Sequence, residues 1–126
     1  MCIRDSSEGQ RLALALAIQL AGQPAVVLLD EPTRGLDYAA KDRLARALSD
    51  LAAAGTAVLL TSHDVEFVAG CAGRAVVLAE GEVVADDVAG DVLCGSPTLA
   101  PQVAKVLAPV RLLTVEAVRR ALGGPA

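Results

Sequence analysis

The sequence predicts an α/β fold with a mostly parallel sheet flanked by helices. Apolar residues make up 54% of the chain and aromatic residues only 2%, so a core must be built from Leu, Val, Ile and Ala. Short runs rich in Val and Leu alternate with longer stretches at helical spacing, as in proteins that cover a parallel sheet with helices. Asp30 and Glu31 follow one such run and His63 follows the next. Ligand sites of parallel sheets lie at these carboxyl ends.

The elements are expected in the following order. Residues 11–22 predict a helix that is apolar nearly all round and therefore buried. Residues 25–29 and 56–62 predict two buried strands. Asp37 predicts the N-cap of a helix over about residues 38–54. The rest of the chain predicts a short helix with Val65 and Val68, a strand over 75–79, its hairpin partner over 82–85, a helical turn over 89–93, and helices over 101–107 and 114–122.

Composition argues against several classes of protein. The net charge of −4 argues against a basic surface for nucleic acid. The longest nearly apolar stretch, residues 12–22, is too short to span a bilayer, and residues 1–5 do not form the apolar region of a signal peptide. The three cysteines are scattered without metal-ligand spacing, which favours reduced cytosolic thiols.

Three groups of residues could carry chemistry. Asp30 could hold Mg²⁺ and Glu31 could polarise an attacking water, although a strand that ends in two solvated acids would look the same. His63 could contact a phosphate, although a lone histidine is more often structural. Residues 7–10 could bind an anion at the start of the first helix, although Ser7 would also serve as an ordinary cap.

Taken together, these groups resemble the motifs of ABC ATPases. Ser7-Glu8-Gly9-Gln10 resembles the signature motif, usually Leu-Ser-x-Gly-Gln, and Val26 to Asp30 resembles the Walker B strand with Glu31 as the catalytic glutamate. Gly35-Leu36-Asp37 is similar to the D-loop, and His63 to the H-loop histidine. The order and spacing of four motifs are far more specific than any one of them. The resemblance implies a P-loop NTPase domain, covering residues 6 to about 118.

The resemblance also implies a role for each residue. In the family, two ATPase domains enclose two ATP molecules head to tail. Asp30 would bind Mg²⁺ through water, Glu31 would act as general base, and His63 would position the γ-phosphate and the attacking water. Ser7, Gly9 and Gln10 would contact the ATP of a second ABC ATPase domain, and Asp37 would reach across the dimer. The implied cofactors are ATP and Mg²⁺.

A finer resemblance is to the ATPases of energy-coupling factor transporters. Residues 30–41, with Arg34-Gly35 in place of the Ser-Ala common in other importers, fit that group, as do residues 61–68 and 96–106. This implies a peripheral subunit on the cytoplasmic face of the membrane. Its partners would be a transmembrane subunit and a substrate-binding membrane component, and it would energise uptake of a vitamin or metal ion.

The sequence departs from the family in ways that shape the expected domains. Ser6 stands where the signature motif normally has Leu, and we interpret residues 1–5 as a truncated or non-native N-terminus. No Gly-x-x-x-x-Gly-Lys-Ser/Thr loop occurs in the sequence. We expect the C-terminal part of an ABC ATPase domain over residues 6–95 and a helical extension over residues 96–126. By resemblance, the phosphate-loop strand belongs between the strand that ends at His63 and the strand over 75–79.

Two other functions stay open at this level. One is a soluble ABC ATPase of DNA repair or translation, which would often carry a coiled-coil insertion or a basic surface. The other is a non-catalytic module that only donates a signature surface. The presence of Glu31 and His63 argues against this second function. The upstream gene sequence would separate all three, through an in-frame phosphate loop and neighbouring genes for membrane proteins.

The 126-residue polypeptide alone is expected not to bind or hydrolyse ATP. Its sequence has no phosphate loop, whose lysine and backbone N–H groups supply most of the affinity for phosphate. Calorimetric titration with Mg-ATP should show no binding in the micromolar range, and clear micromolar binding would refute this expectation.

Overall fold

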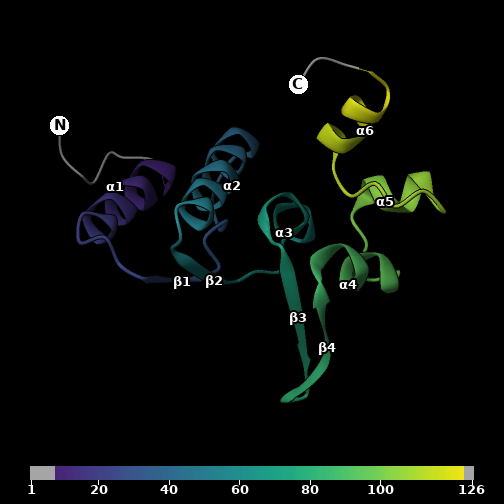
Figure 1. The fold of residues 1–126 in the computed structure, drawn as a ribbon, viewed down its shortest axis with the longest axis horizontal. Helices are drawn as coiled ribbons and strands as arrows, with labels where there is room; N and C mark the ends of the chain where they lie inside the picture. The colour runs from purple at the N-terminus through teal and green to yellow at the C-terminus, as the bar shows by residue number, and fades with distance from the viewer. Residues whose placement is uncertain (1–7, 124–126) are drawn as a thin grey trace. The chain divides into compact units, whose positions relative to one another are not determined.

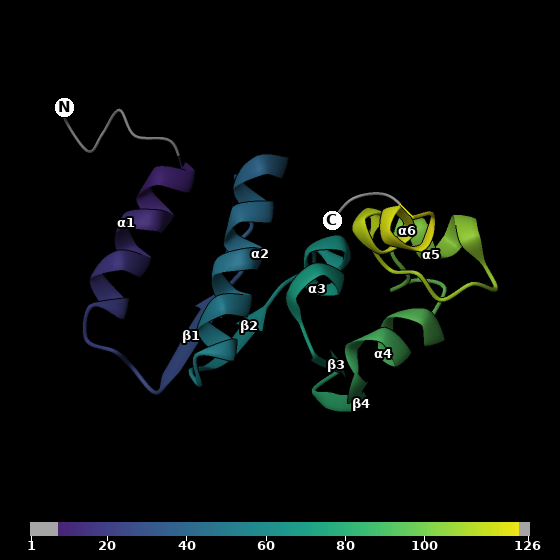
Figure 2. The same cartoon turned by 45° about the horizontal axis from the view of Figure 1, so that its top comes forward.

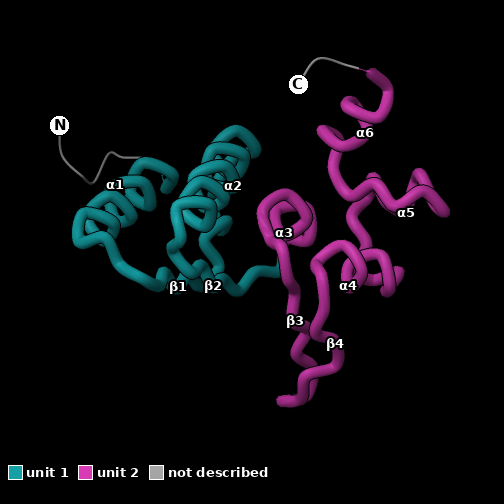
Figure 3. Tube along the Cα trace, in the orientation of Figure 1, with its two compact units in different colours: residues 1–63 teal, residues 64–126 magenta. Residues whose placement is uncertain are grey.

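A computed structural model describes residues 8–123 of the chain. Ser7 and the interpreted N-terminus over residues 1–5 lie outside the described residues. The chain divides into two compact units, residues 1–63 and 64–126 (Figure 3). This division does not test the expected domain boundary at residue 95, which stays a prediction.

The first unit contains two helices and a pair of parallel strands. Its elements are α1 (Glu8–Leu20), β1 (Val26–Asp30), α2 (Tyr38–Ala53) and β2 (Ala57–Thr61) (Figure 1). β1 and β2 pair in parallel, from Val26 opposite Ala57 to Asp30 opposite Thr61. The predicted parallel α/β arrangement is confirmed, and the two strands end at the same edge of the sheet.

The crossover helix α2 forms as the sequence predicts. The Asp37 carboxylate accepts a hydrogen bond from the backbone N–H of Ala40 at 2.7 Å, which satisfies one free donor of the first turn. Leu44 and Leu48, four residues apart, are buried on one side of the helix. α2 contacts β2 and lies beside both strands in two views (Figures 1 and 2). The connection between two parallel strands is therefore a helix packed on their sheet.

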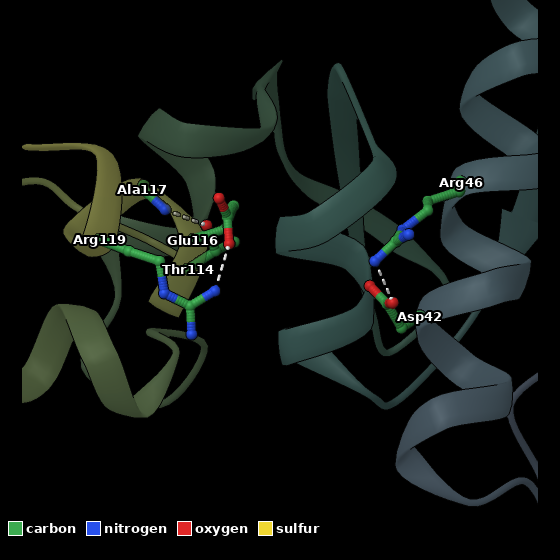
Figure 4. Close-up of polar contacts among 6 residues, drawn as sticks. All are labelled: Asp42, Arg46, Thr114, Glu116, Ala117 and Arg119. Atoms are coloured by element: carbon green, nitrogen blue, oxygen red, sulfur yellow. Dashed lines mark hydrogen bonds and ion pairs between the residues drawn. The ribbon is translucent and has the colours of Figure 1, made fainter. Parts of the chain in front are cut away.

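The exposed side of α2 carries an ion pair between two residues that lie one helical turn apart. Arg46 donates to Asp42 at 2.5 Å (Figure 4), the i, i+4 spacing at which helical side chains meet. Both side chains are largely exposed, so the pair adds little to the free energy of folding. α2 thus holds its place through its buried leucines.

The second unit contains an antiparallel hairpin and four short helices. Its elements are α3 (Val65–Cys71), β3 (Arg74–Ala79), β4 (Glu82–Val88), α4 (Ala89–Gly95), α5 (Gln102–Leu107) and α6 (Val115–Ala121). β3 and β4 pair through the turn Glu80-Gly81, where both residues have positive φ, as a two-residue hairpin turn requires. The predicted hairpin and all the predicted short helices are confirmed to within a few residues.

The second unit has a small buried core, and its last helix has a side-chain cap. Phe67, Val92 and Leu93 are buried, and α4 contacts α3 and both strands of the hairpin. The Thr114 hydroxyl accepts from the backbone N–H of Ala117 at 3.1 Å and so caps α6 (Figure 4). The buried Phe67, Val92 and Leu93 therefore lie on α3 and α4, and α4 packs on the hairpin.

Two expectations about burial are wrong for the described chain. α1 begins at Glu8, which places Gly9 and Gln10 inside its first turn, and it has no buried residue; Ile18 is 64% exposed. In the strands only Val27 is buried, while Leu28 is 71% and Leu59 is 65% exposed. The physical reason is that the parallel sheet described here has two strands and is packed against α2. Apolar side chains suited to a larger sheet therefore lack neighbours to bury them.

Within residues 8–123, no helix combines the length and the apolar content needed to cross a bilayer. In the same part of the chain β2 pairs only with β1 and β3 only with β4, in two separate sheets.

The isolated 126-residue polypeptide is expected to be only marginally folded. A two-stranded sheet with bare apolar side chains is close to the limit of stability in water. Amide hydrogen exchange on the purified polypeptide should be fast for residues 26–29 and 58–60. Protection of these amides for hours would show that the core closes without further strands.

Candidate functional site at the ends of two parallel strands

The last paired residues of the parallel strands bring Asp30 and Thr61 face to face. Asp30 ends β1 and Thr61 ends β2, directly opposite each other. The Thr61 hydroxyl donates a hydrogen bond of 2.5 Å from Oγ1 to Oδ1 of Asp30. A hydrogen bond to a carboxylate is among the stronger ones in proteins, so this contact fixes the orientation of Asp30.

Glu31 leaves the strand in an unusual backbone conformation. Its φ is +45°, in the left-handed region that residues other than glycine rarely adopt, at a cost of about 1–3 kcal/mol. Its backbone N–H donates to the Thr61 carbonyl oxygen at 3.1 Å and to Thr61 Oγ1 at 3.3 Å. These bonds hold the chain in the sharp turn that ends β1.

The turn brings Glu31 to the predicted histidine. Oε1 of Glu31 lies 3.3 Å from Nε2 of His63, which follows the end of β2. The Glu31 side chain is 33% exposed and the His63 side chain 97% exposed. Because His63 is almost fully accessible, it adds little to stability and is free to contact a ligand. A carboxylate beside an imidazole is an arrangement suited to moving a proton.

The loop after Glu31 leads through a buried hydroxyl and a glycine to Asp37. Thr33 is only 6% exposed, and its Oγ1 lies 3.5 Å from Oγ of Ser62. Gly35 has a φ of +74°, and a Cβ at this position would lie 3.2 Å from Cγ of Glu8. The positive φ therefore favours glycine at residue 35, and a side chain there would press on the Glu8 side chain.

The remaining predicted residues lie in the same unit. Asp37 is exposed, but one of its carboxylate oxygens already caps α2. Gly9 and Gln10 lie in the first turn of α1, where backbone N–H groups and the helix dipole favour an anion. The start of α1 approaches the loop that carries Asp37 through the contact between Glu8 and Gly35.

The structure thus joins Asp30, Glu31 and His63 at one edge of the sheet. Sequence reasoning missed Thr61 as part of this group, although a hydroxyl side chain that ends an apolar run was a visible signal. It also missed the Thr33–Ser62 contact, which depends on how the loop folds back.

The site fits only part of a magnesium nucleotide. Asp30 offers a carboxylate oxygen of the kind that Mg²⁺ prefers. Among residues 8–123, however, no three His, Cys, Asp or Glu side chains gather closely enough to hold a metal by themselves. The sequence also lacks a phosphate loop. A magnesium ion at Asp30 would therefore need ligands besides the acidic and histidine side chains described here.

Other features of the described chain take no part in this site. Burial raises the pKa of the Cys71 thiol to about 11, so this cysteine stays protonated at neutral pH, and Cys94 is also free. Two hollows, of about 530 and 330 Å³, lie within residues 64–126 and are lined by none of the predicted residues.

Most of the chain is similar in sequence to known ATP-binding proteins. Residues 1–69 match the family model described as "AAA domain, putative AbiEii toxin, Type IV TA system". The chain is 63% identical over 119 residues to a "Putative ABC transporter ATP-binding protein" of Streptomyces coelicolor, which covers 94% of this chain and 21% of that protein. A protein of the same description from Streptomyces avermitilis is 60% identical over the same shares. The cobalt import ATP-binding protein CbiO of Rhodobacter capsulatus is 43% identical over 94 residues, 75% of this chain and 34% of that protein.

The chain spans about a fifth of the length of the Streptomyces proteins that it matches. The matched family model covers more than half of the chain and includes the whole Asp30, Glu31 and His63 group. The chain therefore belongs to this AAA-domain family, and its relatives include proteins described as ABC transporter ATP-binding proteins.

Proposed function

We propose that this segment is part of a longer ATP-hydrolysing subunit of an ABC-type importer, called the longer protein below. The observation that carries the proposal is the contact between Glu31 and His63 at the shared end of two parallel strands. A general base must lie within reach of the proton that it takes, and a second group must hold the water in line. One strand end supplies the first group and the neighbouring strand end the second.

The residues divide the work as follows. Glu31 takes the proton of the attacking water, and His63 orients that water and the terminal phosphate. Mg²⁺, bound through water beside Asp30, would neutralise charge on the phosphates. Ser7, Gly9 and Gln10 contact the ATP of a second ABC ATPase domain, and Asp37 reaches across the dimer. The exposure of His63 and of the first turn of α1 supports this division, since both must be accessible to ligands.

The subunit would work on the cytoplasmic face of a membrane, bound to a transmembrane subunit and a substrate-binding membrane component. Closure of the ATPase dimer would drive uptake. We propose that it belongs to the energy-coupling factor group, because residues 30–41 resemble that group. Its cargo would then be a vitamin or a metal ion. Relatives named for cobalt import and for ribose import both match the chain, so substrate choice is expected to lie in another subunit.

Replacing Glu31 with Gln in the longer protein should abolish turnover and preserve nucleotide binding. The amide keeps the shape of the side chain but cannot accept the proton, so kcat should fall about 100-fold or more. ATP should then hold the dimer closed, visible as a doubled mass in gel filtration. His63→Ala should also lower kcat strongly, with a smaller effect on binding.

Glu80→Gln is the matched control, because Glu80 is an exposed acid in the β3–β4 turn. It should leave kcat unchanged. Near wild-type hydrolysis by the Glu31→Gln variant would remove Glu31 as the base. An inactive wild-type protein that still binds through its signature residues would favour the non-catalytic module instead.

A further inference from the structure

We propose that Thr61 is a positioning residue, whose hydroxyl sets the geometry of both acidic residues in the site. The inference rests on the proposed function, because it concerns how Asp30 and Glu31 are held for ATP hydrolysis. It goes beyond that function in giving a role to a residue outside the groups predicted to contact nucleotide.

One hydroxyl group of Thr61 makes two contacts with consecutive residues of β1 and its turn. Oγ1 donates its hydrogen to Oδ1 of Asp30 and accepts the backbone N–H of Glu31. A hydroxyl has one hydrogen to give and two lone pairs to receive, so both contacts can be made at once. The Asp30 carboxylate and the Glu31 backbone are therefore held by the same atom.

The bond to Asp30 has a direct consequence for metal binding. Because Oδ1 accepts from Thr61, the carboxylate cannot rotate freely, and this restraint sets the directions in which its oxygens can meet a metal-bound water. A carboxylate ligand is commonly oriented by such an outer hydrogen bond, whose loss weakens metal affinity.

The bond to Glu31 acts on the direction of the general base. The left-handed backbone of Glu31 is unfavourable by itself and needs outside support. Thr61 gives that support twice, through its carbonyl oxygen and its hydroxyl. Loss of the hydroxyl leaves only the carbonyl contact, so the turn that aims Glu31 at His63 becomes less well defined.

A pair of substitutions separates the hydroxyl from the shape of the side chain. Thr61→Val keeps the branched shape and favours a strand, but removes the hydroxyl. Thr61→Ser keeps the hydroxyl and removes a methyl group. Thr56→Val is the matched control, because Thr56 lies just before the opposite end of β2. All three variants should melt within a few degrees of the wild-type protein.

In the longer protein, Thr61→Val should lower kcat about tenfold or more with little change in KM for ATP, and should require more Mg²⁺ for half-maximal rate. Thr61→Ser and Thr56→Val should stay within about twofold of wild type, since each keeps the hydroxyl at residue 61.

A second readout needs neither nucleotide nor turnover. Hydrogen exchange of the Glu31 amide in the nucleotide-free longer protein should be faster in Thr61→Val than in wild type, and unchanged in Thr61→Ser. Wild-type kcat together with unchanged Glu31 exchange in Thr61→Val would overturn the proposal. Equal losses of kcat and melting temperature in Thr61→Val and Thr61→Ser would also overturn it, since they would show a packing role. If the wild-type protein proved inactive, the proposed function would fail, and the exchange measurement would still decide whether Thr61 holds Glu31.

Discussion

The parallel pairing of β1 with β2 is the constraint on which the rest of the site depends. Five residue pairs align the two strands so that they end opposite each other, with Asp30 beside Thr61. The residues that follow both strands therefore emerge at one edge of the sheet. Glu31 and His63 then come within 3.3 Å although 31 residues separate them. A slip of one residue would turn every side chain of one strand to the other face and separate this group. The arrangement proposed to be catalytic is thus a consequence of strand register.

The elements that could be predicted from the sequence are those fixed by local chemistry. Neighbouring residues alone predict three of them, and the structure confirms all three: the helix that Asp37 caps, the turn at Glu80-Gly81, and the strand that ends at Asp30. Asp30, Glu31 and His63 could also be predicted to share an edge, because parallel strands end together. The positive φ of Glu31 could not be predicted, because it depends on a hydrogen bond to a residue 30 positions away. The approach of Glu8 to Gly35 is a second case, since tertiary packing brings the start of α1 to a loop.

Burial was predicted less well than structure type. Leu28, Leu59 and Ile18 have the apolar character of core residues but are exposed in the described chain. The apolar pattern of a sequence reflects the surroundings in which its side chains are buried. This chain spans about a fifth of the length of its Streptomyces relatives. We propose that other segments of the longer protein cover these side chains. The site residues are less affected, because their contacts are hydrogen bonds within one strand pair and its loops.

The most direct test of the account is a structure of the longer protein with Mg²⁺ and a non-hydrolysable ATP analogue. The account predicts that Asp30 and Thr61 remain paired, that Glu31 keeps its positive φ, and that Glu31 and His63 both lie beside the terminal phosphate. An extended Glu31 with its side chain turned away, or a His63 remote from the nucleotide, would contradict the claim that strand register builds the catalytic edge.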